Sequence, residues 1–504
     1  MNILLVYPRY AESFWGFKHA LKFIGKKAAY PPLGLLTVAA LLPAAWEKKL
    51  VDMNVKKINE SDVKWADYVF ISAMAIQRDS VSEVVNLSKK YGKKIVAGGP
   101  LFTMEYDNFP EIDYLVLNEG EVTVPQFLAD LEKGSLRRIY DARDWPKLSD
   151  SPIPLWDLLN FKDYASMSIQ FSRGCPYHCD FCNITSLFGK NPRLKSAGQL
   201  LEELDSLYYR GWRGGVFVVD DNFIGNKNVI KREVLPAMIR WMKDKKYPFT
   251  FVTEASVNLA DDDDLLYLMR EAGFSTIFVG IETPSEEGLE ECNKFQNVNR
   301  SLLASVKKIQ NHGIQVSAGF IVGFDSDTTG IFDRMISFIE QSSITTAMVG
   351  LLNAPQGTRL FDRLNAEKRI LSGFSGNNTD FFMNFIPKMD PNKLVEGYKR
   401  IVTTIYSPEV YYKRILAFVK DYKPISNGNL SRLRFYYLKA FCRATWMLGF
   451  IEKGKKHYWK MVLSTLIKCP KRLPDAITLA VYGFHFRKIF SKETKGTVPM
   501  VNEN

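Results

Sequence analysis

Three cysteines in one short loop are the residues of this chain most suited to carry chemistry. Cys175, Cys179 and Cys182 are spaced C-x₃-C-x₂-C, and no fourth cysteine lies nearby in the sequence. A closed structural zinc site needs four ligands, and a cluster held by protein alone needs a fourth thiolate. Three thiolates therefore favour a [4Fe–4S] cluster whose fourth iron is open to a small molecule. The alternatives are a zinc site that borrows His178, and buried thiols without a ligand.

Carboxylates stand at the ends of the strands predicted around this loop. Asp220 and Asp221 follow one apolar stretch, while Glu254 and Glu282 end two others. Each of them taken singly has the features of an ordinary loop residue, but the set predicts a binding site. The six predicted strands lie at residues 164–172, 216–219, 249–254, 276–282, 315–322 and 345–352. Six strand–helix units predict a partial TIM-like barrel, in which ligands bind at the carboxyl ends of the strands.

The first 150 residues show a separate alternation of strands and helices. Short apolar strands are predicted at residues 3–7, 68–71, 94–97 and 114–117. Apolar strands separated by helices are typical of a parallel, doubly wound sheet, whose ligands lie at the carboxyl ends of the strands. The candidate binding residues in the loops there are Ser72, Gly98, Gly99, Gly120 and Glu121. A Rossmann-like scaffold without a ligand is the alternative.

Length and composition are those of an enzyme of several domains. The 504 residues are too many for one core, and the six cysteines, three of them in one loop, provide no disulfide framework. Free thiols of this kind favour a reducing, cytoplasmic compartment. We expect neither a signal peptide at the apolar N-terminus nor a membrane-spanning helix, because no uninterrupted apolar stretch of about 18 residues occurs.

Positive charge is concentrated at the C-terminal end. Residues 401–504 carry 19 Lys and Arg against 6 Asp and Glu, whereas the whole chain has a net charge of +12. Large aromatic residues are interleaved with these cations, a pattern that fits nucleic acid or an anionic membrane surface. No nucleic-acid motif accompanies it, so we expect no nucleic acid and favour a peripheral position on the inner face of the membrane. A solvated basic helical face is the alternative.

Several stretches resemble the cobalamin-dependent radical S-adenosylmethionine (SAM) family, and within it the hopanoid C-2 methylase-like proteins. The resemblance implies an α/β chain with a Rossmann-like cobalamin-binding domain at residues 1–150 and a radical SAM (β/α)₆ barrel at 165–387. A mostly α-helical basic region at 388–504 would follow. The stretches that carry the resemblance are 7–10, 170–177, 189–195, 219–226 and 280–284.

The resemblance also implies roles for individual residues. Cys175, Cys179 and Cys182 would hold the cluster, and SAM would lie against the carboxylates of the strand ends and the G-x-I-x-G stretch at Gly319 and Gly323. The acidic residue usual three positions further on is Ser326 here, and we expect the neighbouring Asp325 and Asp327 to be solvated. Cys292, Cys442 and Cys469 are interpreted as core or incidental thiols. The full set for SAM is Asp220, Asp221, Glu254, Glu282, Gly319 and Gly323.

Cobalamin would then occupy the N-terminal domain without a histidine on cobalt. Many cobalamin domains supply that ligand from a D-x-H-x-x-G loop, and residues 52–57 have neither the histidine nor the glycine. The implied reaction is methylation, from methylcobalamin, of an unactivated carbon of a hopanoid or other isoprenoid-type lipid, with flavodoxin or ferredoxin as the electron donor. A radical cyclisation or rearrangement without methyl transfer is the alternative, and a non-catalytic metal-binding adaptor is a third hypothesis.

Overall fold

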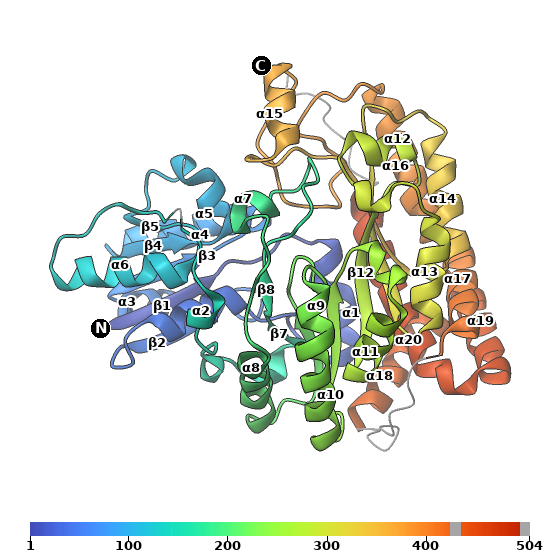
Figure 1. The fold of residues 1–504 in the computed structure, drawn as a ribbon, viewed down its shortest axis with the longest axis horizontal. Helices are drawn as coiled ribbons and strands as arrows, with labels where there is room; N and C mark the ends of the chain where they lie inside the picture. The colour runs from blue at the N-terminus through green and yellow to red at the C-terminus, as the bar shows by residue number, and fades with distance from the viewer. Residues whose placement is uncertain (143, 424–434, 494–504) are drawn as a thin grey trace.

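The computed structural model describes residues 1–142, 144–423 and 435–493. Two parallel six-stranded sheets, each wrapped by helices, follow one another along the chain, and helices complete its C-terminal part (Figure 1). No helix in these ranges is long and apolar enough to cross a bilayer. The two parallel sheets and the C-terminal helices confirm the predicted fold class.

The N-terminal sheet has the strand order β2-β1-β3-β4-β5-β6. Alternate residues of β1 enter two different cores, since Ile3 and Leu5 face α2 and α6 while Leu4 and Val6 face α3, α4 and α5. This two-sided burial is why its strands read as unbroken apolar runs. The bounds are β1 Asn2–Tyr7, α2 Leu33–Leu41, β2 Glu47–Asp52, α3 Glu60–Trp65, β3 Tyr68–Ser72, α4 Arg78–Lys90, β4 Lys94–Gly98, α5 Pro100–Glu105, β5 Tyr114–Val116, α6 Gly120–Glu132 and β6 Ile139–Tyr140.

Two strands of this sheet, β2 and β6, were not predicted. Both lie at its edges. β2 has the sequence Glu-Lys-Lys-Leu-Val-Asp, and charged residues of this kind are typical of edge strands, where they discourage pairing with another chain. β6 has two residues, too few for a pattern.

The second sheet has the order β14-β13-β12-β11-β10-β7 and is parallel throughout, as the six predicted strands require. The pair β8–β9 brackets the cysteine loop, which contains α7. The bounds are β7 Ser166–Ile169, β8 Ser172–Arg173, α7 Ile184–Phe188, β9 Arg193–Leu194, α8 Ala197–Tyr209, β10 Gly214–Val218, α10 Leu235–Asp244, β11 Phe249–Glu254, α11 Asp263–Ala272, β12 Phe274–Glu282, α12 Glu286–Glu291, α13 Leu302–Asn311, β13 Gln315–Val322, α14 Ile331–Ser342 and β14 Thr346–Leu351.

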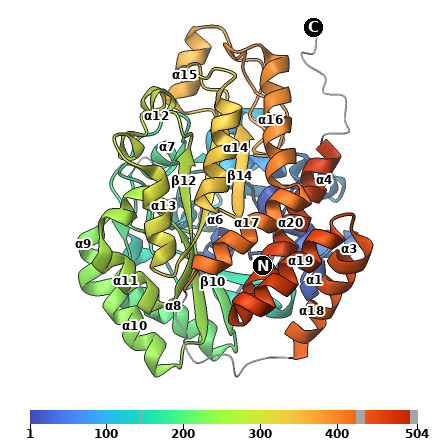
Figure 2. The ribbon, with the colours of Figure 1, turned by 90° about the vertical axis from the view of Figure 1, so that its right-hand side faces the viewer.

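The C-terminal helices close the β14 side of the second sheet. α16 and α20 contact β14, and α17 packs against α19 and α20 (Figure 2). The segment after β1 joins them, since α1 (Lys18–Ile24) packs on α18 and α20 and Phe14 stacks on Phe486 at 4.0 Å. The bounds are α15 Arg359–Ala366, α16 Pro391–Ile405, α17 Pro408–Asp421, α18 Phe435–Trp446, the π-helix η11 Met447–Ile451, α19 Lys455–Lys468 and α20 Leu473–Glu493.

Candidate active site

The three cysteines lie on one loop after β8, each of them partly buried. Their thiols are close enough for their charges to interact, and backbone N–H groups of Tyr177 and Ile184 hydrogen bond to Cys175 and Cys182. Burial raises the pKa of all three thiols, that of Cys182 to about 12, so without metal they are protonated at neutral pH. In the described ranges, no three His, Cys, Asp or Glu side chains converge closely enough to hold a single metal ion. A [4Fe–4S] cluster does not require such convergence, because each thiolate binds a different iron.

A buried ion pair that the sequence analysis missed stands beside these thiols. Nζ of Lys294 lies 2.8 Å from Oε1 of Glu282, at the end of β12, and the charge of Lys294 acts on all three cysteines. Burial alone would lower the pKa of Lys294, but Glu282 and the cysteines raise it above its ordinary value. Glu282 has a left-handed φ of +65°, and its carboxylate folds back over Gly280, where a Cβ would collide with it.

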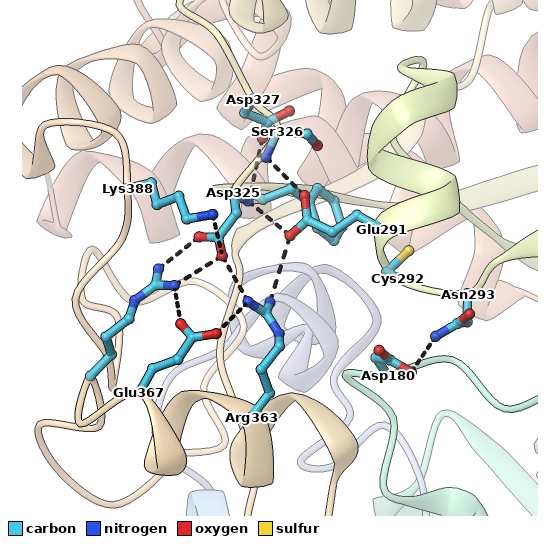
Figure 3. Close-up of polar contacts among 12 residues, drawn as sticks. Asp180, Glu291, Cys292, Asn293, Asp325, Ser326, Asp327, Arg363, Glu367 and Lys388 are labelled. Atoms are coloured by element: carbon cyan, nitrogen blue, oxygen red, sulfur yellow. Dashed lines mark hydrogen bonds and ion pairs between the residues drawn. The ribbon is translucent and has the colours of Figure 1, made fainter.

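The cysteine loop is fixed to the barrel on its far side. Asp180 accepts a hydrogen bond from Asn293 Nδ2 at 2.7 Å (Figure 3). The backbone N–H of Asp180 donates to the carbonyl of Cys292 at 3.0 Å. Cys292 is buried, and its Sγ donates to the carbonyl of Leu289. These contacts give the loop between Cys179 and Cys182 a defined position before any cofactor binds.

The two aspartates after β10 have different environments. Both carboxylate oxygens of the fully buried Asp220 accept hydrogen bonds, from Phe171 N at 2.8 Å and Ser172 Oγ at 2.5 Å. Asp221 accepts a long hydrogen bond from Gly174 N at 3.4 Å and a further one from its own backbone N–H. Burial raises the pKa of Asp220 to about 7 and that of Asp221 to about 6. Asp220 thus positions the strand that leads into the cysteine loop, and Asp221 is the one of the two available to a ligand.

Glu254, at the end of β11, is the freest of the predicted carboxylates. Among the described residues its carboxylate has no hydrogen-bond partner, and burial with the neighbouring charge of Asp221 raises its pKa to about 8. Asp221, Glu254 and the Glu282–Lys294 pair interact electrostatically, so they share one region at the carboxyl ends of β10, β11 and β12. A ligand with a cationic or hydrogen-bond-donating group fits this region.

The G-x-I-x-G stretch begins on β13 and ends at Gly323, the residue directly after the strand. Gly319 packs beneath Phe278, which a Cβ would approach to 2.8 Å, and Gly323 has a left-handed φ of +106°. The expectation that Asp325 and Asp327 are solvated is wrong. Asp327 accepts hydrogen bonds from the backbone N–H groups of Gly323 and Phe324 at 2.8 and 3.1 Å.

Asp325 lies at the centre of a charged network (Figure 3). It pairs with Arg369 at 2.7 Å, Arg363 at 2.8 Å and Lys388 at 3.6 Å, and its side chain is 8% exposed. Burial alone would raise its pKa, but the arginines lower it far below the usual value. The partners come from α15 and the segments after it, so the sequence around Asp325 did not reveal them. The network ties β13 to the C-terminal part of the chain.

The candidate residues of the N-terminal domain fall into two groups. Ser72, Gly98 and Gly99 meet at the ends of β3 and β4, where a Cβ on Gly99 would lie 2.8 Å from Ser72 Oγ. A Cβ on Gly98 would lie 2.6 Å from the carbonyl of Val116. The two glycines are thus required where the ends of β3, β4 and β5 pack closely against one another.

Gly120 and Glu121 lie apart from that group and contact other parts of the chain. Gly120 packs on α2 beside Val38. The guanidinium of Arg173 forms ion pairs with the carboxylate of Glu121 at 2.7 Å and with that of Glu119 at 2.5 Å. Glu119 further pairs with Arg193. Since Arg173 is two residues before Cys175, these buried pairs join the N-terminal domain directly to the cysteine loop.

The loop where many cobalamin domains carry an axial histidine is occupied by Asn54. Its side chain accepts a hydrogen bond from Tyr10 N at 2.9 Å and donates to Asp52 at 2.8 Å. Asp52 in turn accepts from Tyr164 Oη at 3.0 Å, a residue just before the second sheet. The loop is therefore held within the protein by its own hydrogen bonds.

The N-terminal domain contacts the second domain beside the cysteine loop. The φ of Gly357, after β14, is +79°, and a Cβ there would collide with Met104 of α5. The carbonyl of Gly357 accepts a 2.6 Å hydrogen bond from Ser186 Oγ of α7. The segment after β14 therefore contacts both α5 of the N-terminal domain and α7 of the cysteine loop.

Three family matches divide the chain in the same order as the structure. Residues 27–128 match the B12 binding domain, residues 169–339 the radical SAM superfamily, and residues 358–497 a domain of unknown function named DUF4070. The predicted boundaries at 150, 165 and 387 stay predictions.

Similar proteins cover nearly the whole chain. An uncharacterized methyltransferase of Synechocystis is 42% identical over 96% of this chain and 91% of its own length. The hopanoid C-2 methylase of Rhodopseudomonas palustris is 35% identical over 93% and 90%, respectively. Among solved structures, the cobalamin-dependent SAM radical enzyme OxsB with aqua-cobalamin bound has a TM-score of 0.64 at 14% identity, covering 98% of this chain and 80% of that one.

Proposed function

Because this chain belongs to the cobalamin-binding radical SAM methyltransferases, we propose that it methylates an unactivated carbon of a hopanoid or another isoprenoid-type lipid. Its cofactors are a [4Fe–4S] cluster, SAM and cobalamin. When bound, they supply a radical able to remove hydrogen from an aliphatic carbon and the methyl group that replaces it.

The residues of this chain hold and orient these groups in our proposal. Cys175, Cys179 and Cys182 bind the cluster, as the fit of three partly buried thiols with backbone N–H donors supports. Asp221 and Glu254 receive the polar end of SAM. The small residues at the ends of β3 and β4 admit cobalamin, and the closely packed domains exclude water.

The observation that carries the lipid substrate is the 35% identity, over 93% of this chain, to a hopanoid C-2 methylase. Apolar side chains on one face of the second sheet also support a lipid substrate. Trp15 contacts Phe278 of β12 at 5.2 Å between ring centroids and Met348 of β14 at 3.0 Å from its Nε1. Along β12, Ile277 and Val279 are fully buried, so Phe278 faces the opposite side. An apolar inner surface of this kind suits a hydrocarbon substrate.

Lipid profiling of a host with and without this chain tests the substrate. We expect a lipid heavier by one methyl group to disappear when the chain is deleted and to return with the wild-type gene. The Cys179→Ala gene is the matched control and should not restore it. A lost product with the same carbon count as its precursor would support cyclisation or rearrangement instead. An unchanged lipid profile would count against a lipid substrate.

A second prediction concerns cobalamin. None of the five histidines lies in the matched B12 domain, and Asn54 fills the ligand loop. We therefore expect the Co(II) form of the bound cofactor to show no nitrogen superhyperfine splitting from a lower ligand in electron paramagnetic resonance. Asn54→His supplies the comparison, because it restores an imidazole at that position. Clear nitrogen splitting in the wild type, or no cobalamin binding, would contradict this prediction.

We also propose an electron donor and a location. The cluster needs a one-electron reductant such as flavodoxin or ferredoxin, and the basic C-terminal region supports a position on an anionic membrane surface, where a lipid substrate resides.

A further inference from the structure

Five large apolar side chains are exposed together on the C-terminal helices. Trp446 is 62% exposed, Phe450 54%, Leu463 55%, Leu466 44% and Ile467 80%. We refer to these five residues of α18, η11 and α19 as the apolar patch. Single exposed apolar residues are ordinary in proteins, whereas a contiguous group marks a surface of interaction.

Ring contacts and helical spacing show that the patch is continuous. Trp446 lies 5.6 Å from Phe450, and Phe450 lies 5.7 Å from Trp459 of α19, measured between ring centroids. Trp459, Leu463 and Ile467 are four residues apart and share one face of α19. The indole N–H of Trp459 donates to the carbonyl of Gly449 at 2.9 Å, which fixes the two helices together.

The other face of α19 forms the core of this region. Tyr458, Met461, Val462 and Thr465 are buried, and the helix packs on α17 and α20. The patch is thus not a displaced part of the core. In Figure 1, α19 lies at the edge of the molecule opposite the N-terminal sheet, and Figure 2 also shows it on the outside.

The segment that carries the patch is rich in exposed cations and poor in anions. Residues 438–471 contain eight Lys and Arg and a single acidic residue, Glu452, which pairs with Lys488 at 3.1 Å. Within the described ranges, none of these eight cations takes part in an ion pair with a carboxylate. They are Lys439, Arg443, Lys453, Lys455, Lys456, Lys460, Lys468 and Lys471.

We propose that α18, η11 and α19 dock this enzyme on an anionic bilayer, with the apolar patch inserted among the lipid headgroups and the lysines on their phosphates. An exposed apolar stripe flanked by lysines and containing tryptophan and phenylalanine is the composition of interfacial helices. A second copy of the chain fits the same surface poorly, because a symmetric contact would bring both sets of cations together.

The docking surface adjoins the segment that enters the barrel. α1 packs directly against α18, and Trp15, three residues before α1, contacts Phe278 and Met348 of the second sheet. If the proposed function holds, docking would place this segment near the lipid phase. The biological reason for docking rests on the proposed function. The docking itself does not, because binding to vesicles is measured without turnover.

Co-sedimentation of the full-length holoenzyme with vesicles tests the docking. We expect binding to vesicles of phosphatidylglycerol and phosphatidylcholine and weak binding to phosphatidylcholine alone. Leu463→Ser with Ile467→Ser should weaken binding roughly a hundredfold, about tenfold for each buried side chain. Lys456→Glu with Lys460→Glu should weaken it mainly at low salt. Tyr267→Ser, on α11 and 55% exposed, is the matched control and should bind as the wild type does.

The outcomes separate this inference from the proposed function. The docking surface would be overturned if the wild type bound equally well to vesicles with and without anionic lipid. It would also be overturned if the Leu463→Ser, Ile467→Ser variant bound vesicles as strongly as the wild type. Sedimentation equilibrium showing a wild-type dimer that the Leu463→Ser, Ile467→Ser variant abolishes would overturn it as well. SAM cleavage by that variant should stay at the wild-type rate, which shows that it is folded. Methylation of a detergent-dispersed lipid tests the function independently of docking.

Discussion

Replacing Cys175, Cys179 or Cys182 by Ala should abolish SAM cleavage, because each substitution removes one of the three thiolates that we assign to the cluster. Anaerobically reconstituted wild-type protein should hold about four irons per chain, and each variant much less. Iron content, the visible absorption of the cluster and the release of 5′-deoxyadenosine are the three measurements. The spectroscopic readings report on the cluster itself and do not depend on substrate turnover.

Cys292→Ala is the matched control for the cysteine series. Cys292 is buried, and its thiol donates to the carbonyl of Leu289. The carbonyl of Cys292 accepts a hydrogen bond from the backbone N–H of Asp180 in the cysteine loop. Its removal changes packing by one sulfur and leaves the backbone contact in place. The variant should keep its iron and its SAM cleavage. Full cleavage by Cys179→Ala, or loss of the cluster in Cys292→Ala alone, would contradict the assignment of ligands.

The features that the sequence predicted are those coded by neighbouring residues. The three cysteines form one contiguous motif, each strand of the second sheet is a local apolar run, and three of these strands, β10, β11 and β12, have a carboxylate at or just after their end. Parallel pairing then brings Asp221, Glu254 and Glu282 to one edge without further information. The edge strand β2 escaped prediction because its charged residues hide the pattern.

The features that the sequence did not predict depend on pairs far apart in the chain. Lys294 follows Glu282 by twelve residues and carries no motif of its own, so only the fold places its ammonium beside the thiols. Asp325 was interpreted as solvated because its partners, Arg363 and Arg369, come from segments whose position a local pattern does not define. Glu121 was predicted as a cobalamin contact, and its role in holding Arg173 is visible only in the structure.

The contact between Arg173 and Glu121 leads to the second large effect. Arg173 is 10% exposed, and the carboxylates of Glu119 and Glu121 are each 3% exposed. Arg173→Met keeps much of the volume but leaves Glu121 buried without its cation. Breaking a buried pair in this way destabilises a protein by about 3–5 kcal/mol. The free energy of unfolding, measured in denaturant, should fall by that amount.

Arg210→Met is the matched control for this substitution. Arg210 pairs with Asp157 at 2.8 Å, but the two side chains are 37% and 68% exposed. Exposed pairs contribute about 0–1 kcal/mol. A loss of stability in Arg173→Met no larger than in Arg210→Met would refute the structural importance that we assign to the buried pair.

The dependence of this loss on pH identifies Glu121 as the partner. Burial alone would raise the pKa of Glu121, but Arg173 lowers it from 4.5 to about 2 in the folded protein. A carboxylate with a lowered folded pKa contributes stability above its unfolded pKa and loses that contribution as the pH falls through the folded value. In the variant, burial without a cation raises the pKa of Glu121 above its unfolded value, so the variant regains stability as the pH falls through that raised pKa. The difference in stability between wild type and Arg173→Met should therefore be largest at high pH, begin to shrink above the unfolded pKa of Glu121, and shrink further as the pH falls toward about 2.

The same substitution should separate the two halves of the reaction. Arg173 holds the cysteine loop against the N-terminal domain through Glu119 and Glu121, whereas the hydrogen bonds of Asp220 and Asp180 keep that loop on the barrel. SAM cleavage needs the cluster and the barrel, but methyl transfer also needs the cobalamin domain in register with them. At a temperature where Arg173→Met is folded, methyl transfer should therefore fall more than SAM cleavage. Equal losses of both activities would mean that Arg173 acts on the cluster loop alone, and that the domains keep their alignment by other contacts.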